Sequence, residues 1–286
     1  MIFSYFDDSS DDKREKHVAV GGIIGHEIWL NLFEGKWIED TKHLTEPFRS
    51  TDCETKHGQF TNWDKPACDA LMKRLVGVVA DKETGIGSVA FDVVVPLYRE
   101  VFPGCDEKGP MRLAVAKTIV EMARLARKHN EKIQLWFEEG SFDSLILQTY
   151  NDLRAIESWR WDERGRLFRI SFASKELVPL QAADLVAREG YKIADNWMKR
   201  PLRKPVLGIW DRMQMSWYTK PTLELLKAKG WPNLEAIVSL PEDRYIHEQR
   251  NDGTQYFKTG PPEQANPTVD KFLTNLRREK HNETRF

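Results

Sequence analysis

The sequence has few cysteines and no long apolar run. Its 286 residues include three cysteines, too few and too scattered for a disulfide framework, so we expect a cytoplasmic protein in a reducing compartment. No apolar run approaches the roughly 20 residues that span a bilayer. The N-terminus turns acidic at once, which is not typical of a secretory signal. We therefore expect no membrane association.

An excess of either charge is also missing. Lys and Arg number 43 and Asp and Glu number 44, which excludes a histone-like polycation but leaves room for a local basic patch. Hydrophobic residues make up 41% and charged residues 30%, which argues against wholesale disorder and against a fibrous repeat. The length suits one large domain with appendages.

Several common catalytic motifs are absent. The chain contains no G-x-x-x-x-G-K-[ST] or G-x-G-x-x-G, which argues against a standard NTPase or Rossmann enzyme, and no G-x-S-x-G or H-E-x-x-H. Cys53 and His57, with Cys68 and His43 nearby, fit no standard zinc-ligand spacing. The chemistry must therefore be sought among other side chains.

The order of apolar segments predicts an α/β fold with a mixed sheet. A short polar link between the first two strands favours an antiparallel hairpin, and helical crossovers favour parallel pairing of the later strands. A long helix over 180–199 is expected to pack against the sheet. The five expected strands lie at 2–6, 17–24, 86–95, 132–137 and 167–172.

We expect the main domain to cover residues 1–200, with an insertion of about 26–84 between strands two and three. Residues 201–286 read as a helical or irregular C-terminal extension. Its tail, from about Pro241, is polar and expected to be partly disordered. The aromatic-rich segments 28–37 and 210–218 are the ones we expect at an interface if the chain forms a homo-oligomer.

Three carboxylates occupy related positions. Asp7 ends the first strand and Glu138 ends the fourth, and open α/β sheets collect ligands at such strand ends. Asp184 lies in a helix that is apolar all round, so its charge must be neutralised, paired or bound to metal. Two alternatives are open for Asp184: an ion pair with Arg188, or a divalent cation shared with the other two. Taken singly, Asp7 with Asp8 also fits turn chemistry and Glu138 fits a solvated strand end.

Four segments together resemble one protein family. YFDDSS with the GGII strand after it, FRSTDCETKHGQFTNW, FEEGS and PLQAADLVARE are similar to motifs of the bacterial and phage family called domain of unknown function 3800. The resemblance covers roughly residues 2–197. It implies a ribonuclease H-like fold: a five-stranded mixed sheet flanked by helices. It also implies a nuclease or related phosphoryl-transfer role, and the family context implies defence against foreign nucleic acid.

The resemblance also implies roles for particular residues. Asp7, Glu138 and Asp184 match its carboxylate positions and would hold two Mg²⁺ or Mn²⁺ ions for phosphodiester hydrolysis. Asp8, Asp52 and Glu139 are further candidates, as a fourth ligand or a supporting group; Asp92 ranks lower. The family motif Phe-His-x-x-Asp is matched by Phe48 and Asp52, but Arg49 stands in place of the His, so this chain lacks any role that depends on that His. The alternative function is a module of the same fold that binds nucleic acid or protein without cleavage.

Basic residues run from the middle of the long helix to just beyond its end. Arg188, Lys192, Lys199 and Arg200 are interleaved with Tyr191 and Trp197, which suits contacts to phosphates and stacking on bases. The other interpretation is an ordinary solvated helix end, where cations complement the helix dipole. We also expect the loop 45–62 to cover the acidic cluster, because long ordered loops in compact domains are usually functional.

Overall fold

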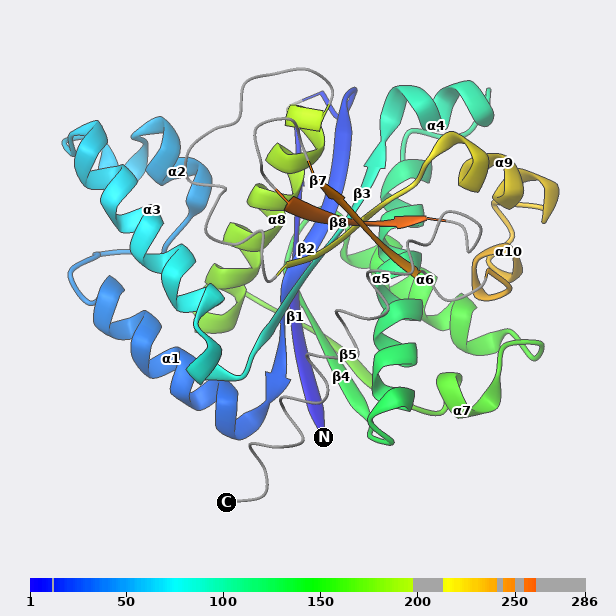
Figure 1. The fold of residues 1–286 in the computed structure, drawn as a ribbon, viewed down its shortest axis with the longest axis horizontal. Helices are drawn as coiled ribbons and strands as arrows, with labels where there is room; N and C mark the ends of the chain where they lie inside the picture. The colour runs from blue at the N-terminus through cyan, green and yellow to red at the C-terminus, as the bar shows by residue number, and fades with distance from the viewer. Residues whose placement is uncertain (12, 198–212, 241–243, 250–254, 261–286) are drawn as a thin grey trace.

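The computed structural model describes residues 1–11, 13–197, 213–240, 244–249 and 255–260. Its centre is a six-stranded mixed sheet with the strand order β5-β4-β1-β2-β3-β6, seen nearly edge-on in Figure 1. All five predicted strands are present, and a sixth joins them. The strands are β1 (Ile2–Ser10), β2 (His17–His26), β3 (Gly87–Val94), β4 (Ile133–Glu138), β5 (Leu167–Ala173) and β6 (Met213–Trp217).

The predicted strand directions are confirmed. β2 pairs antiparallel with β1 and with β3, so the first three strands form a meander. β4 lies parallel to β1, and β5 lies parallel to β4, as expected for strands joined by helical crossovers. The carboxyl ends of β1, β4 and β5 therefore meet at one edge of the sheet.

The sixth strand comes from the segment that we assigned to the extension. β6 pairs in parallel with β3, from Ser88 and Met213 to Asp92 and Trp217. The segment MQMSW alternates apolar and polar residues, which is the period of a strand. Part of the predicted tail also has strand structure: β7 (Arg244–Gln249) and β8 (Gln255–Gly260) form a separate antiparallel pair. The rest of the tail lies outside the described residues.

One face of the sheet is covered by helices from the predicted insertion and by the predicted long helix. A hydrophobic core that includes Tyr5, Ile23, Leu75 and Val186 joins this layer to the sheet. Asp64 caps the third helix by accepting a hydrogen bond from the amide of Ala67. The layer contains α1 (Glu27–Thr41), α2 (Ser50–Thr55), α3 (Lys65–Ala80) and α8 (Val178–Trp197), with short 3-10 turns at Gly58–Phe60 and Lys82–Thr84.

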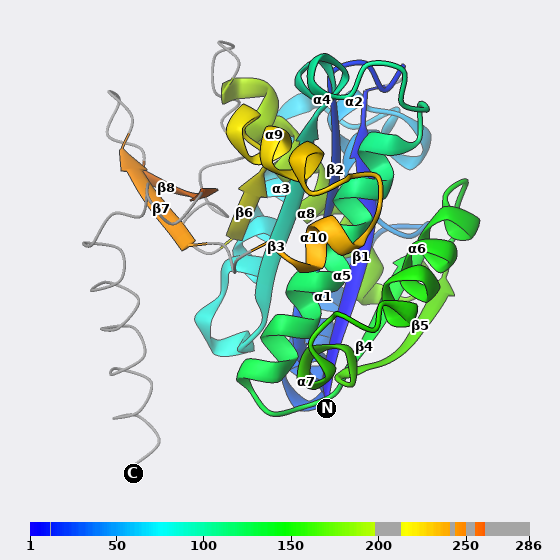
Figure 2. The same ribbon diagram turned by 90° about the vertical axis from the view of Figure 1, so that its right-hand side faces the viewer.

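The other described helices cover the opposite face, which Figure 2 views from the front, so the described part of the molecule has three layers, seen from the edge in Figure 1. Side chains alternate along β1: Tyr5 belongs to the first core, whereas Phe6 packs with Phe91 and Leu113 in the second. The second layer contains α4 (Val95–Val101), α5 (Gly109–Lys128), α6 (Asp143–Ala155), α7 (Trp161–Arg164), α9 (Lys220–Ala228) and α10 (Glu235–Val238).

Helix α8 lies directly on the sheet, as its apolar sequence predicts. A Cβ atom at Gly21 of β2 would lie 2.5 Å from Cα of Ala187, and one at Gly190 would lie 2.6 Å from Cβ of Ala90 in β3. Both glycines are therefore needed for this close approach. The contact places the first turns of α8 over the end of β1, where the site forms.

The two segments predicted at an interface occupy different places in the fold. Helix α1 buries Leu30, Phe33 and Trp37 but exposes Ile28 and Leu32, which are 71% and 42% accessible. In the other segment, residues 213–217 form β6 and residues 210–212 lie outside the described residues. Within the described residues, no helix is both long and apolar enough to span a membrane.

Candidate functional site

The register of the parallel strands brings Asp7 and Glu138 together. Phe6 of β1 pairs with Phe137 of β4, so the residue that follows each of them lies at the same edge of the sheet. Glu138 in turn pairs with Ala173 at the end of β5. The carboxyl ends of three neighbouring parallel strands thus form one row, the edge where open α/β sheets bind ligands.

Asp184 reaches this row from α8. Its Oδ2 accepts a hydrogen bond of 2.6 Å from the amide of Ser50, at the start of α2. One turn earlier, Gln181 Oε1 accepts from Trp37 Nε1 at 3.0 Å and from the amide of Phe48 at 3.2 Å. The bonds from Phe48 and Ser50 fix the first turns of α8 against the segment 45–62, which borders the carboxylates. We expected this segment to be a loop, but it contains α2 and a 3-10 turn.

Lys175 sits among the three carboxylates. Its ammonium nitrogen lies 3.0 Å from Asp7 Oδ2, 2.8 Å from Glu138 Oε2 and 2.9 Å from Asp184 Oδ1. Because each oxygen lies within 3.0 Å of the same nitrogen, no two of them can be more than twice that distance apart. The structure therefore brings together the three carboxylates that the sequence indicated, and it adds a lysine that the sequence analysis missed. We call these four residues the acidic cluster.

The acidic cluster is short of positive charge. Burial raises the pKa of Asp7 most, Lys175 opposes this, and the charges of Asp184 and Glu138 raise it further, so the pKa stands well above its ordinary value. Burial alone would lower the pKa of Lys175, but the three carboxylates outweigh that effect and raise it. The Lys175 side chain is only 6% exposed, so water does little to screen these charges. One ammonium serves three carboxylates, and the excess is negative.

Within the described part of the chain, no group of three His, Cys, Asp or Glu side chains stands in position to hold a metal ion. This includes the cysteines and histidines around Cys53, and it includes the acidic cluster as it stands, since its carboxylates surround an ammonium. The donors themselves are nevertheless suitable: carboxylate oxygens are the ligands that Mg²⁺ and Mn²⁺ prefer. The excess negative charge also fits a cation of higher charge than Lys175 carries.

The remaining predicted acidic residues lie at the margin or elsewhere. Asp8 is exposed and follows Asp7 in a strand, so its side chain points to the opposite face; its amide donates to Asp7 Oδ1 at 2.7 Å. Asp92 pairs with His17 Nδ1 at 3.2 Å. Glu139 is exposed. Among the described contacts of Lys175 there is none with Asp52, whose Oδ2 lies near Gly58 in its own loop.

Arg49 is an exposed cation at the rim of the cluster. Its Nη2 lies 3.8 Å from Glu138 Oε1, and its side chain is 55% exposed. It precedes Ser50, whose amide binds Asp184, so the same short segment supplies both contacts. The sequence showed Arg49 only as a departure from the family motif and did not place it at the site.

The predicted nucleic-acid contacts are placed differently from the expectation. Arg188 pairs with Glu54, whose Oε2 lies 3.1 Å from its Nε, whereas Asp184 pairs with Lys175. Lys192 is 3% exposed and pairs with Glu189 at 2.6 Å and with Glu54, so it is buried rather than available on the surface. Lys199 and Arg200 lie outside the described residues.

Comparison with known proteins adds no assignment. No protein-family model matches the chain, and no curated protein matches it. The geometry of the acidic cluster must therefore carry the functional argument.

Proposed function

We propose that the protein is a divalent-metal-dependent nuclease built on a ribonuclease H-like fold. One observation carries the proposal: carboxylates from β1, β4 and α8 converge on a single cation at the carboxyl edge of the parallel strands. Side chains so far apart in sequence meet at one point because strand register and helix docking both direct them there. Enzymes that hydrolyse phosphodiesters with two metal ions use converging carboxylates of this kind.

The strand topology supports the fold assignment. An antiparallel meander of β1, β2 and β3 is continued beyond β1 by parallel β4 and β5, and the helix after β5 packs on the meander. This is the element order expected of a ribonuclease H-like domain. β6 lies beyond β3 and forms one edge of the sheet, whereas β4 and β5 lie toward the other edge.

In the proposed reaction, Asp7, Glu138 and Asp184 hold the metal. Bound Mg²⁺ or Mn²⁺ supplies an activated water and stabilises the leaving oxygen of the phosphodiester. The chain orients its own ligands. The amide of Asp8 donates to Asp7 Oδ1 and the amide of Ser50 donates to Asp184 Oδ2. The other oxygen of each carboxylate points to the Lys175 ammonium, the position that a metal would take. Preorganised ligands of this kind reduce the cost of reaching the reactive geometry.

The proposed substrate is DNA or RNA. Arg49 supports this choice, because an exposed guanidinium beside the carboxylates is well placed to pair with a backbone phosphate, and Arg suits planar contacts with phosphate oxygens. Protection against foreign nucleic acid is the cellular role that the resemblance to the 3800 family suggests for such an activity.

A binding module without cleavage is the second candidate. Lys175 favours it, since its ammonium already occupies the point to which all three carboxylates turn. A cluster closed by a lysine can stabilise a fold without any metal.

A cleavage assay separates the two candidates. Wild type, Asp184→Asn and a control, Asp152→Asn, are incubated with single- and double-stranded DNA and RNA in Mg²⁺, in Mn²⁺ and in chelator. Asp152 is 43% exposed and pairs with Arg112, away from the cluster. We expect metal-dependent cleavage that Asp184→Asn lowers at least about 100-fold and Asp152→Asn leaves unchanged. Binding without cleavage under every condition would favour the module.

A further inference from the structure

Lys175 is bound by an unusually complete set of partners. An ammonium has three N–H donors, and the three carboxylates supply one acceptor oxygen each at 2.8 to 3.0 Å. The group is buried, and burying a charge is favourable only when it is paired and hydrogen-bonded. The same three oxygens are the ones that the proposed function assigns to a metal.

Hydrogen bonds hold the backbone around Lys175. Gln181 Nε2 donates to the carbonyl of Lys175 at 2.9 Å, and the amide of Leu177 donates to Ser174 at 3.1 Å, so the short connection from β5 to α8 is fixed. The ammonium ends a flexible four-carbon stem. Displacement of the ammonium therefore calls for rotation about side-chain bonds rather than for a break in these backbone contacts.

We propose that Lys175 is the resident counterion of the site: it holds the three carboxylates together in the metal-free protein, and a divalent cation displaces it. This inference rests on the proposed function and deepens it. A divalent ion brings twice the charge of the ammonium to the same oxygens, which the negative excess of the cluster favours, and it repels the ammonium at short range. Metal binding and burial of Lys175 therefore exclude each other.

Such an exchange has a consequence for affinity. The metal must compete with an intramolecular cation, so its apparent affinity is lowered by the fraction of molecules in which Lys175 occupies the cluster. Removal of the ammonium should strengthen metal binding, although it removes a cation that stabilises the metal-free fold. An ordinary structural lysine elsewhere in the protein should show neither effect.

The first experiment labels lysine amines in the wild-type protein and reads each site by mass spectrometry, in chelator and in saturating Mn²⁺. Lys175 should be nearly unreactive in chelator and become at least about tenfold more reactive with Mn²⁺, because the metal releases the ammonium. Lys117 is the matched control, since its side chain is 4% exposed and pairs with Glu121 on the other face of the sheet. Equal labelling of Lys175 in both conditions, with Mn²⁺ bound, would overturn the proposal. This experiment needs no variant, so it decides the question even if the variant below does not fold.

The second experiment measures Mn²⁺ binding by calorimetry for wild type, Lys175→Met and Lys117→Met. We expect Lys175→Met to bind Mn²⁺ at least about tenfold more tightly than wild type, and Lys117→Met to match wild type. If wild type and Lys175→Met bind equally, the counterion proposal is overturned and the nuclease proposal stands. If only Lys175→Met binds, the counterion proposal is supported and metal-dependent cleavage by the natural protein is overturned. If neither binds Mn²⁺, both proposals fail.

Discussion

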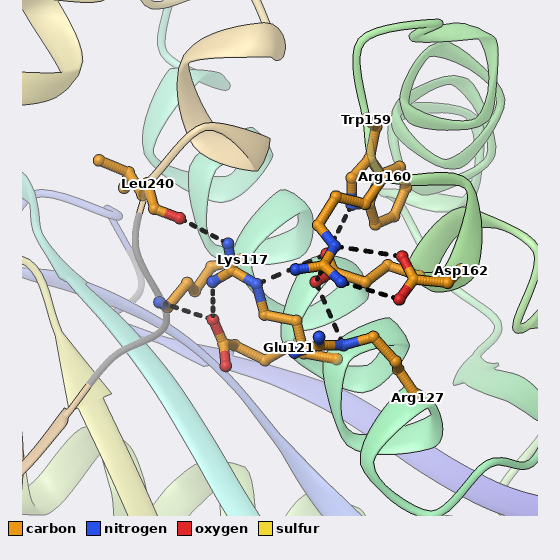
Figure 3. Close-up of polar contacts among 9 residues, drawn as sticks. Lys117, Glu121, Arg127, Trp159, Arg160, Asp162 and Leu240 are labelled. Atoms are coloured by element: carbon orange, nitrogen blue, oxygen red, sulfur yellow. Dashed lines mark hydrogen bonds and ion pairs between the residues drawn. The ribbon is translucent and has the colours of Figure 1, made fainter.

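Two buried ion clusters in the described part of the chain lie on opposite faces of the sheet and can be compared directly. The acidic cluster under α8 has three carboxylates and one lysine. The other, which we call the α5 cluster, joins α5 to α7 and to the end of α10 (Figure 3). Its residues are Lys117, Glu121, Arg124, Arg127, Trp159, Arg160, Asp162, Glu163 and the carbonyl of Leu240.

The α5 cluster has no excess of carboxylates: the cations are Lys117, Arg124, Arg127 and Arg160, and the carboxylates are Glu121, Asp162 and Glu163. Glu121 Oε1 accepts from Lys117 Nζ at 3.0 Å and from Arg124 Nη1 at 2.7 Å. Arg124 Nη2 also donates to the carbonyl of Leu240 at 2.6 Å, which ties α10 to α5. Burial would raise the pKa of Glu121, yet the two cations outweigh it and lower the pKa below its ordinary value. The same burial leaves the pKa of Asp7 well above its own ordinary value.

This contrast separates two uses of buried charge. A cluster in which every carboxylate is paired with a cation keeps its acids ionised and serves to join helices. A cluster with excess carboxylates keeps an acid with a raised pKa beside the sheet edge where ligands bind, and perturbed groups of this kind concentrate at functional sites. Composition alone does not reveal the difference, because both clusters lie on elements with apolar surroundings.

The largest expected effect is on stability in the α5 cluster. Glu121→Gln leaves two buried cations without their carboxylate and should lower the free energy of unfolding by about 3–5 kcal/mol. Asp184→Asn should cost about 1 kcal/mol or less, because Lys175 keeps Asp7 and Glu138, and the amide oxygen of Asn can still accept from Ser50. Urea denaturation in chelator measures both variants.

An equal loss in the two variants would erase the proposed distinction. A large loss in Asp184→Asn would make the acidic cluster as structural as the α5 cluster, whereas a small loss in Glu121→Gln would mean that its cations find other partners. Refolded wild type in the same buffer provides the reference for both.

Much of the fold could be predicted because local pattern and tertiary environment agree. Apolar runs at 2–6 and 132–137 mark strands wherever they lie, and their ends place Asp7 and Glu138 at a common edge. The apolar helix around Asp184 indicates burial, and burial indicates a partner. Convergence of the three carboxylates followed from these features.

The partners themselves could not be predicted from local pattern. Lys175 lies in a connection without periodicity, and only the register of β5 beside β4 shows that its side chain reaches the cluster. Spacing allowed an ion pair of Arg188 with Asp184, but Arg188 instead pairs with Glu54 on α2. Likewise Glu121 reads as part of a solvated helix face until α7 and α10 cover it.

The two clusters should also respond to pH in opposite directions. The folded-state pKa of Asp7 is raised, so its stability contribution is present below its ordinary value of 3.8 and is lost as the pH rises through the folded pKa. The folded-state pKa of Glu121 is lowered from 4.5, so its contribution is present above that value and is lost as the pH falls. In either pH range, one such group cannot change the free energy of unfolding by more than about 1.4 kcal/mol per pH unit.

Asp7→Asn tests this sign. Compared with wild type in chelator, the variant should lose less stability as the pH rises above 4, because it has no proton to release, while its amide oxygen can still accept from Asp8. Glu121→Gln should instead lose less stability than wild type as the pH falls. Melting temperatures measured in half-unit steps of pH give both slopes; parallel curves for wild type and Asp7→Asn would show that Asp7 is ionised as readily in the folded protein as in the unfolded chain.

The smallest expected effect on stability, and the most specific for function, concerns the arginine at the rim of each cluster. Arg49 and Arg160 are 55% and 61% exposed, but Arg160 binds Asp162 through Nε at 3.1 Å and Nη2 at 2.9 Å, whereas the nearest carboxylate oxygen to Arg49 is 3.8 Å away. Substitution of either by Gln should cost under about 1 kcal/mol, as for other surface ion pairs. Only Arg49→Gln should weaken nucleic-acid binding, by about tenfold, because only its guanidinium adjoins the acidic cluster and is loosely enough held to pair with a phosphate. Fluorescence anisotropy with labelled oligonucleotides in chelator measures the affinity without cleavage. Equal affinities for the two variants would remove Arg49 from the substrate contacts and leave the acidic cluster without an identified phosphate-binding neighbour.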